Sequence, residues 1–391
     1  MKLLSDRGGK SIIRVLSNLS AGFLLLVLLT PCVLRFGVLL YTDRQHNAIF
    51  LPGPYVVSDR TRAFHHAAFV ADMHADSLLW GRDLRERHTR GHVDIPRLLD
   101  GGVDLQVFSV VTKVPGPLNY DSNSGNTDSL PLLFLASWRH PATWFNPKER
   151  ALAQAREMTR LAEKTPLSLV LRLSDLSTEG IKGLLALEGM HALGGGEDAL
   201  IEFFSAGFRM MGLVHFFDNE IAGSVHGTDK YGLTELGRSL IPRMEELGIT
   251  VDLAHASAAA IEETLGLATK PVVVSHVGVR GTCQVQRNLS DAQLRGIAEN
   301  GGVVGIGYWK RAVCDASLQG IVAAILYAIK VAGVDHVGLG SDFDGNIAAP
   351  FDTTGLPMLT EYLLAAGLSE EDVGKVLGGN VRRVLTANLP E

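Results

Sequence analysis

The chain has 391 residues, of which 46% are hydrophobic and 20% are charged, with a formal net charge of -6. This composition is that of a globular protein with a large core, in one big domain or two ordinary ones. Mild acidity without any Lys/Arg-rich run argues against nucleic-acid binding. The three cysteines, Cys32, Cys283 and Cys314, are too few for a disulfide framework or a Cys-type zinc site.

An apolar segment, "AGFLLLVLLTPCVL" (Ala21–Leu34), follows a basic N-terminus. It has the length of a signal peptide, and with its extension past Arg35 it could just span a bilayer. The basic flank predicts that the N-terminus stays in the cytoplasm and that the bulk of the chain is translocated. We expect residues 1–45 to comprise a cytoplasmic tip and a hydrophobic signal anchor, which stays uncleaved because no small-x-small cleavage site is evident. A cleaved signal peptide is the alternative. Residues 46–66 read as a linker.

In the remainder, residues 67–391, short apolar or β-branched runs alternate with longer helical stretches. Near-continuous apolar strands are typical of a parallel sheet that is covered on both faces. Eight of them with helices between predict a (β/α)8 TIM-type barrel. A doubly wound open sheet is the alternative, but no Gly-x-Gly-x-x-Gly follows the first run. The expected strands are Ala68–His74, Val103–Val111, Gly183–Met190, Phe208–Phe216, Ile249–His255, Pro271–His276, Gly302–Tyr308 and His336–Asp342.

Three of the intervening stretches carry clear helix signals. "PKERALAQAREMTRLAEK" begins with Pro147 at a plausible first helical position. "LTELGRSLIPRMEELG" has an apolar stripe at helical spacing, interrupted by Pro242, which predicts a kink or a break. "LQGIVAAILYAIKVAG" ends in Gly333, a good C-cap signal.

Ionisable side chains gather where the expected strands end. In a barrel these ends share one face, the face on which active sites are built. Neutral imidazoles and carboxylates suit a pair of divalent ions such as zinc, which needs one bridging carboxylate and about two further ligands for each ion. Water bound to such ions is acidified towards a pKa of ~7 and becomes a hydroxide nucleophile. The residues are His74, Asp76, Glu188, His215, His255, His276 and Asp342.

These residues resemble a known family, the membrane (renal) dipeptidases, which are binuclear zinc peptidases on a (β/α)8 barrel of the metal-dependent hydrolase kind. The resemblance runs from about Phe69 to Leu385. It rests on separate motifs in a fixed order: D-x-H-x-D at Asp72–Asp76, "EG", "LVHFFDN", "DLAHAS", "SHVG", "RN" at Arg287–Asn288, "GSDFDG" and "GGNVRRVL".

The resemblance implies two Zn²⁺ ions per chain. His74 and Asp76 would bind one ion, His255 and His276 the other, and Glu188 would bridge them. The implied reaction is the hydrolysis of a dipeptide by a metal-bridging hydroxide.

The resemblance also assigns the substrate-binding and proton-transfer roles. His215 would stabilise the oxyanion, Arg287 would hold the C-terminal carboxylate of the substrate, and Asp342 would shuttle the proton, with Asp344 as the alternative. An amidohydrolase or lactonase on the same barrel is a rival function, although a neutral ester or lactone would not require Arg287. A non-catalytic binder is a second rival, and it predicts a missing ligand, whereas none is missing.

Several other residues receive structural interpretations. His65 and His66 precede the first strand and are expected at the surface, and His336 is expected to have a structural role at the opposite face of the barrel. Asp72 and His191 are candidates for supporting the metal ligands. Cys283 and Cys314 could pair in an oxidising compartment, but their spacing does not demand it.

The long segment after the second strand, Val114–Phe145, leaves the catalytic face, and we expect it to form a lid or pocket wall that selects substrates. The expected partners are a dipeptide and, through the N-terminal segment, a membrane, while a homodimer stays open. The catalytic domain is expected outside the cytoplasm, in the periplasm or at the cell surface, or secreted if the signal is cleaved.

Overall fold

The computed structural model describes residues 30, 33, 37 and 39–391 of the chain. The predicted signal anchor, Ala21–Leu34, lies outside the described residues except for Thr30 and Val33. Within the described part, no helix has both the length and the apolar character needed to cross a membrane.

Parallel strands form a closed barrel, as the sequence predicts. They pair in the order β2-β1-β9-β8-β7-β6-β5-β4-β3, and because β2 also pairs with β4, eight strands close a ring with β3 outside it. Each expected strand overlaps one strand of the ring. The bounds are β1 Ala71–Ala75, β2 Leu105–Val111, β3 Leu167–Leu169, β4 Ile181–Glu188, β5 Phe208–Gly212, β6 Thr250–Asp252, β7 Val273–Val277, β8 Val303–Ile306 and β9 Val337–Leu339.

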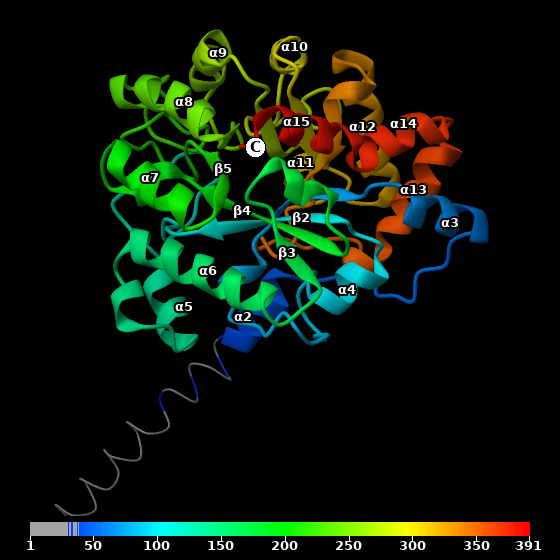
Figure 1. Cartoon of the computed structure of the whole chain (residues 1–391), viewed down its shortest axis with the longest axis horizontal. Helices are drawn as coiled ribbons and strands as arrows, with labels where there is room; N and C mark the ends of the chain where they lie inside the picture. The colour runs from blue at the N-terminus through cyan, green and yellow to red at the C-terminus, as the bar shows by residue number, and fades with distance from the viewer. Residues whose placement is uncertain (1–29, 31–32, 34–36, 38) are drawn as a thin grey trace, which may run out of the picture.

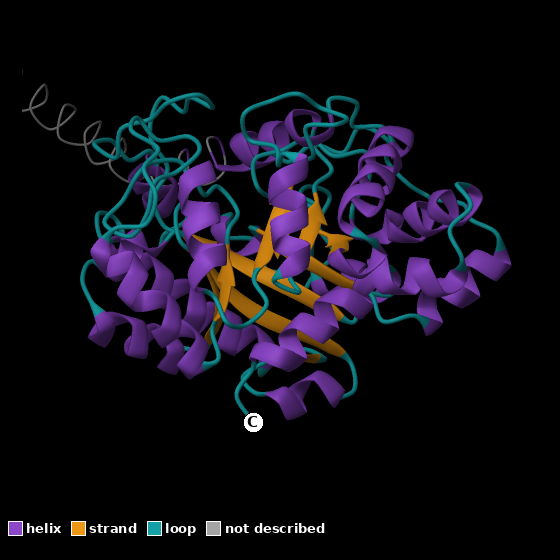
Figure 2. Ribbon diagram, turned by 90° about the horizontal axis from the view of Figure 1, so that it is seen from above, coloured by secondary structure: helices purple, strands orange, loops and turns teal. Residues whose placement is uncertain are grey.

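Helices surround the barrel and cover the outer face of its strands (Figures 1 and 2). Every residue of β2 and β4 is buried, which explains why these strands are apolar almost throughout. The helices are α2 Leu40–His46, α3 Asp59–Ala67, α4 Ile95–Asp100, α5 Leu130–Ala136, α6 Pro147–Ala162, α7 Glu197–Ser205, α8 Glu235–Leu247, α9 Ala258–Leu267, α10 Asp291–Glu299, α11 Lys310–Val313, α12 Leu318–Ala332, α13 Leu356–Ala365, α14 Glu370–Gly374 and α15 Asn380–Asn388.

An apolar layer inside the barrel lies beneath the C-terminal ends of the strands. Met73, Val107 and Met210 come from different strands and pack together with Val381 and Leu385 of α15. Because successive side chains of a strand point to opposite faces, these residues alternate with those that pack against the outer helices. The polar ends of the strands therefore lie above a continuous layer of apolar side chains.

The helix signals are mostly confirmed. α6 begins at Pro147 with the Asn146 side chain as its cap, and α12 ends one residue before Gly333. The break expected at Pro242 does not occur, because α8 continues from Glu235 to Leu247 with this proline inside it.

The prediction that His65 lies at the surface is wrong. Its side chain is fully buried, with Nδ1 2.7 Å from Thr360 Oγ1 and Nε2 2.9 Å from the carbonyl oxygen of Gly101. The segment predicted as a linker contains α3, which packs against α13, and helical geometry directs His65 inward while its neighbour His66 is exposed. His336 binds the Gly302 carbonyl oxygen in the turn before β9, in keeping with its structural interpretation.

Cys283 and Cys314 are joined by a disulfide bond. The bond connects the segment between β7 and α10 to the end of α11, and so fastens two loops on the same rim of the barrel. The pairing that the sequence left open is thereby settled.

Candidate active site

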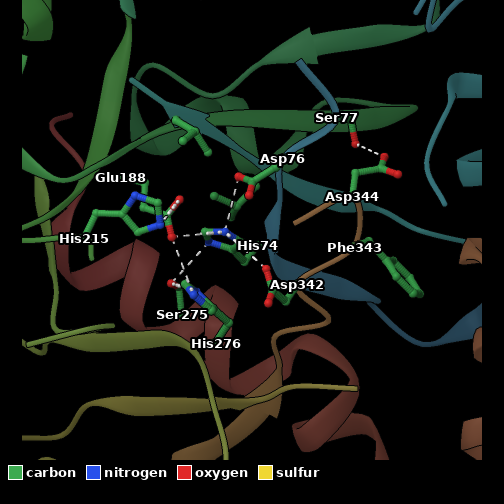
Figure 3. A network of polar contacts seen from close by, with 12 residues as sticks. His74, Asp76, Ser77, Glu188, His215, Ser275, His276, Asp342, Phe343 and Asp344 are labelled. Carbon is green, nitrogen blue, oxygen red and sulfur yellow. Dashed lines mark hydrogen bonds and ion pairs between the residues drawn. The ribbon is translucent and has the colours of Figure 1, made fainter. Parts of the chain in front are cut away.

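The expected site residues come together at the C-terminal ends of the strands. His74 lies in β1 and His276 in β7, Glu188 is the last residue of β4, and Asp76 directly follows β1. Figure 3 shows these side chains with His215 and Asp342 directed toward a common centre. His255, in the loop after β6, joins them through the contacts described next. None of these side chains is more than slightly exposed.

The carboxylate of Glu188 occupies the middle of the cluster. Its Oε1 atom lies 3.7 Å from His74 Nε2, 3.2 Å from His255 Nε2 and 3.6 Å from His276 Nε2. Its Oε2 atom lies 3.4 Å from His215 Nε2. The Glu188 carboxylate thus lies among imidazoles that come from several strands of the barrel.

Potential ligand atoms fall into overlapping groups of three. Glu188 belongs to two of them, one with His74 and Asp76 and one with His215 and His255. A third group joins His74 and His276 to Asp342. In addition, His255 Nε2 and His276 Nε2 lie 2.9 Å apart, so both rings present a nitrogen to the same small space.

The donor atoms fit a divalent metal. Among the described residues, His74 Nε2, Asp76 Oδ1 and Glu188 Oε2 are buried without a hydrogen-bond partner. Each buried polar atom left unsatisfied costs about 1–3 kcal/mol, so the fold tolerates them here for a reason other than stability. Imidazole nitrogens and carboxylate oxygens are the ligands that zinc and similar ions prefer.

The pKa shifts that the protein itself produces also favour a bound metal ion. Burial raises the pKa of Glu188 and of Asp342 well above the ordinary value for a carboxyl group. Burial also lowers the pKa of His255 and His276 well below the usual range, which keeps the rings in the neutral form that binds metals. A bound dication would supply the positive charge that these crowded carboxylates lack.

His74 is the exception among the imidazoles. Burial opposes its protonation, but the carboxylates of Asp76 and Glu188 outweigh burial and raise its pKa to about 10. The Asp76 Oδ1 atom lies 3.4 Å from His74 Nε2. The carboxylates of Asp76 and Glu188 therefore place negative charge beside the His74 ring.

Carboxylates behind the ligands hold the strand ends in place. Asp72 accepts hydrogen bonds from the backbone N–H and the hydroxyl of Ser341, each at 2.7 Å, and so ties β1 to the loop that carries Asp342. Asp252 accepts from the Ser275 hydroxyl at 2.6 Å, and that hydroxyl oxygen lies 3.0 Å from His276 Nδ1. The Asp252–Ser275 support was missed by sequence reasoning, although Asp252 lies three residues before His255 in "DLAHAS".

Asp344 does not point into the cluster, as Figure 3 shows. Its carboxylate pairs with Arg82 Nη2 at 2.5 Å and accepts a hydrogen bond from the Ser77 hydroxyl at 2.7 Å. Burial disfavours its charge, but Arg82 and His92 hold its pKa well below the usual range. Because Asp344 is engaged elsewhere, the structure leaves Asp342 as the aspartate of this loop that faces the site.

The rim beside the cluster contains Arg287 and residues that could not be singled out from the sequence. Arg287 is buried and donates from Nη2 to the His276 carbonyl oxygen at 2.7 Å. The guanidinium of Arg311 stacks 4.1 Å from the ring centre of Tyr120. His226 is buried, with Nδ1 2.6 Å from the Tyr120 carbonyl oxygen and its ring 5.2 Å from that of His255.

The segment Val114–Phe145 contains the helix α5, and its first part lies against the site. The Asn123 backbone N–H donates to the His226 carbonyl oxygen at 2.7 Å. Tyr120 and His226 could not be singled out from the sequence, because only the folded loops bring them together. His191 hydrogen-bonds with the Thr112 hydroxyl at 2.8 Å.

The closed barrel with imidazoles and carboxylates crowded at its C-terminal rim defines a metal-dependent hydrolase. Residues 58–389 match the model of the membrane dipeptidase family, peptidase family M19, and the chain belongs to this family. The resemblance seen in the motifs is thereby confirmed, and with it a peptide-bond hydrolase.

Individual relatives agree with this assignment. Dipeptidase aclJ of Aspergillus oryzae is 30% identical over 349 residues, which cover 81% of this chain and 77% of the relative. A metallopeptidase of Rhodobacter sphaeroides, solved with a phosphinate mimic of the dipeptide L-Ala-D-Ala, superimposes with a TM-score of 0.69 at 26% identity, covering 82% of this chain and 99% of that one. The M19 metallopeptidase dipeptidase AC gives a TM-score of 0.70 at 26% identity, with coverage of 83% and 99%.

Proposed function

We propose that this protein is a zinc-dependent dipeptidase with two Zn²⁺ ions. The observation that carries the proposal is the central Glu188 carboxylate, whose Oε1 atom faces His74, His255 and His276. His74 and Asp76 would hold one ion and His255 and His276 the other, with Glu188 between them. When bound, such ions acidify water and polarise the scissile carbonyl.

Residues of the chain would perform the remaining tasks. Arg287 would bind the C-terminal carboxylate of the dipeptide with its planar guanidinium. Asp342, whose pKa is raised by burial, would take the proton of the attacking water and pass it to the departing amine. Each turnover then consumes one dipeptide and one water and releases two amino acids.

His215 would stabilise the oxyanion of the tetrahedral intermediate. Its Nδ1 atom lies 3.3 Å from the carbonyl oxygen of Lys113, which can only accept, so Nδ1 carries the proton of the neutral ring. Burial lowers the pKa of His215 to about 4. Nε2 would therefore donate to an oxyanion only after taking up a second proton from bulk solvent, and the negative charge of the intermediate would favour that uptake.

Substrate selection would fall to the wall formed by the first part of Val114–Phe145. Tyr120 and Phe216 lie with ring centres 5.4 Å apart, and Arg311 stacks on Tyr120. In the rival function, hydrolysis of a neutral ester or lactone on the same barrel, the substrate would offer no carboxylate for the buried Arg287 to bind.

We also propose that the apolar segment Ala21–Leu34 directs the domain out of the cytoplasm, either as an anchor or as a cleaved signal. The Cys283–Cys314 disulfide supports an oxidising compartment, since such bonds are rare in the cytosol.

The test is a dipeptide panel assayed on the purified protein, with metal content measured alongside. The panel includes L,L and L,D substrates, because the Rhodobacter sphaeroides relative was solved with a mimic of L-Ala-D-Ala. We expect cleavage of at least one class, loss of activity after chelation and recovery on zinc add-back. Activity that survives complete removal of metal would contradict the proposal, as would a zinc-loaded protein that cleaves no dipeptide.

A further inference from the structure

The loop that carries Asp342 has an unfavourable backbone. Asp342, Asp344 and Asn346 have φ angles of 61°, 63° and 62°, all in the left-handed region. Asp and Asn adopt this conformation more readily than other residues with a Cβ, but it still costs free energy, and three such residues within five positions need surrounding contacts to hold them. Something must therefore hold this segment, and with it the carboxylate that faces the metal ligands.

Asp344 makes many of the contacts that fix the backbone of this loop. Besides its ion pair with Arg82, its carboxylate accepts from the His92 backbone N–H at 2.7 Å. Its own N–H donates to His92 Nδ1 at 3.1 Å, and its carbonyl oxygen accepts from Trp80 Nε1 at 2.6 Å. The middle of the loop is thus bound through side chain and backbone alike.

Arg82 has a second carboxylate partner in a distant part of the sequence. Its Nε atom lies 3.7 Å from Asp43 Oδ2, and both side chains are buried. Asp43 also binds Arg90 Nε at 2.6 Å and accepts from Asn47 Nδ2 at 2.9 Å. A Cβ at position 91 would collide with the Arg82 guanidinium, so Gly91 leaves the space that this buried pair occupies.

Asp43 belongs to residues 40–51, called here the N-terminal arm, which precedes the family match at residues 58–389. The arm also touches the loop directly. The Asn346 N–H donates to Asn47 Oδ1 at 3.1 Å, and the Ala349 N–H donates to the Ala48 carbonyl oxygen at 2.9 Å. The arm therefore contacts the segment after Asp342 both directly and through Arg82.

We propose that the N-terminal arm is a positioning element of the active site. Asp43 acts through Arg82 and Asp344 to hold the loop backbone, so that Asp342 faces the metal ligands. Asp43 and Asn47 are positioning residues, since neither touches the reacting atoms. The inference deepens the proposed dipeptidase function and rests on the role assigned to Asp342.

The experiment uses the full chain with Asp43→Asn, which keeps the shape of the side chain but removes its charge. We expect kcat to fall about 10-fold while KM changes less than about 2-fold, because misplacement of a catalytic group affects the chemical step. Zinc content should stay normal, and amide hydrogen exchange over residues 342–349 should accelerate. Asp43→Glu restores the charge and should recover most of kcat.

The matched control is Glu245→Gln. Glu245 is another buried carboxylate, which accepts from the N–H groups of Thr269 and Lys270 at 2.8 Å, at the opposite end of the barrel. This variant should lower the melting temperature without changing kcat or the exchange of 342–349. If Asp43→Asn fails to fold, Asn47→Ala provides the same comparison, because it removes the acceptor of the Asn346 N–H.

An unchanged kcat, or unchanged exchange of 342–349, in a folded and zinc-loaded Asp43→Asn variant would overturn the role of the arm. A failure of the proposed function looks different, because the parent protein itself would then cleave no dipeptide. The exchange measurement still decides in that case whether the arm holds the loop.

Discussion

Buried histidine and glutamate side chains differ in their hydrogen bonding between the two ends of the barrel. At the C-terminal rim, His74 and Glu188 are buried with ring nitrogen and carboxylate oxygen lacking hydrogen-bond partners. At the other end, His65 has both ring nitrogens bonded, and Glu245 accepts from Thr269 and Lys270. The unpaired buried atoms at the rim cost stability but are available to bind a ligand. The buried polar groups at the opposite end are hydrogen-bonded and stabilise the fold.

The strongest challenge to this contrast is Glu188→Gln. An amide keeps the shape but cannot bridge two cations, so metal binding and the stabilisation that it supplies should both be lost. We expect kcat/KM to fall at least about 10³-fold, since metal ions contribute several kcal/mol to the transition state. Zinc content by mass spectrometry and dipeptide turnover check this. A variant with two tightly bound zinc ions and full activity would contradict the site.

Asp342→Asn separates proton transfer from metal binding. We expect kcat to fall about 10²-fold or more, the usual contribution of a general acid or base, with zinc retained. Turnover is compared with metal content for the same sample. If Asp344→Asn, and not Asp342→Asn, removed proton transfer from a folded protein, the assignment within this loop would be reversed.

Arg287→Lys tests the carboxylate clamp. Lysine retains the charge but loses the planar fork, so kcat/KM for a free dipeptide should fall about 10-fold. A dipeptide with an amidated C-terminus is the control substrate, and its rate should fall much less. Equal losses on both substrates would show that Arg287 does not bind the carboxylate.

Tyr120→Ala probes the wall contributed by Val114–Phe145. Removing the ring enlarges the space beside Phe216, so the preference between bulky and small dipeptides should shift about 10-fold in kcat/KM. Zinc content should be that of the parent. An unchanged order of preference across the panel would rule out a role of this wall in selection.

At the opposite end of the barrel, His65→Gln should affect stability and not activity. Burial lowers the pKa of His65 from 6.5 to about 4, so the fold favours the neutral ring. Its contribution is fully present above pH 6.5 and is lost as the pH falls toward about 4. Between about pH 7 and about pH 5 the parent should lose about 2 kcal/mol more unfolding free energy than the variant. Urea unfolding at both pH values measures this, and parallel losses would refute it.

The sequence contained enough to predict the barrel and the rim cluster, and the reason is physical. Parallel strands are apolar throughout, so the carboxylate and His residues at their ends and just beyond stand out, as Glu188 and His255 do. His65 was misplaced because α3 is short and follows a segment without clear periodicity. From the sequence alone, Asp344 was an alternative to Asp342 for proton transfer, because its ion pair with Arg82 joins distant parts of the chain.

Contacts between loops were beyond prediction for a different reason. The pairing of Cys283 with Cys314, and that of Tyr120 with His226, depends on where loops of different βα units lie. Local propensity and hydrophobic period carry no information about such long-range contacts. The hydrogen bond between Ser275 and Asp252 is an intermediate case. Both residues lie in motifs that the sequence shows, but their contact could not be predicted from it.

The ring closes between the first and the last strand, where Asp72 pairs with Leu339 and the Asp76 N–H donates to the Phe343 carbonyl oxygen at 2.9 Å. His74 and Asp342 therefore meet only when both ends of the domain are in place. A chain still under synthesis, with β9 inside the ribosome, lacks part of the site that its earlier strands prepare. Catalysis then begins at completion of the chain, and a product truncated before β9 has no active form.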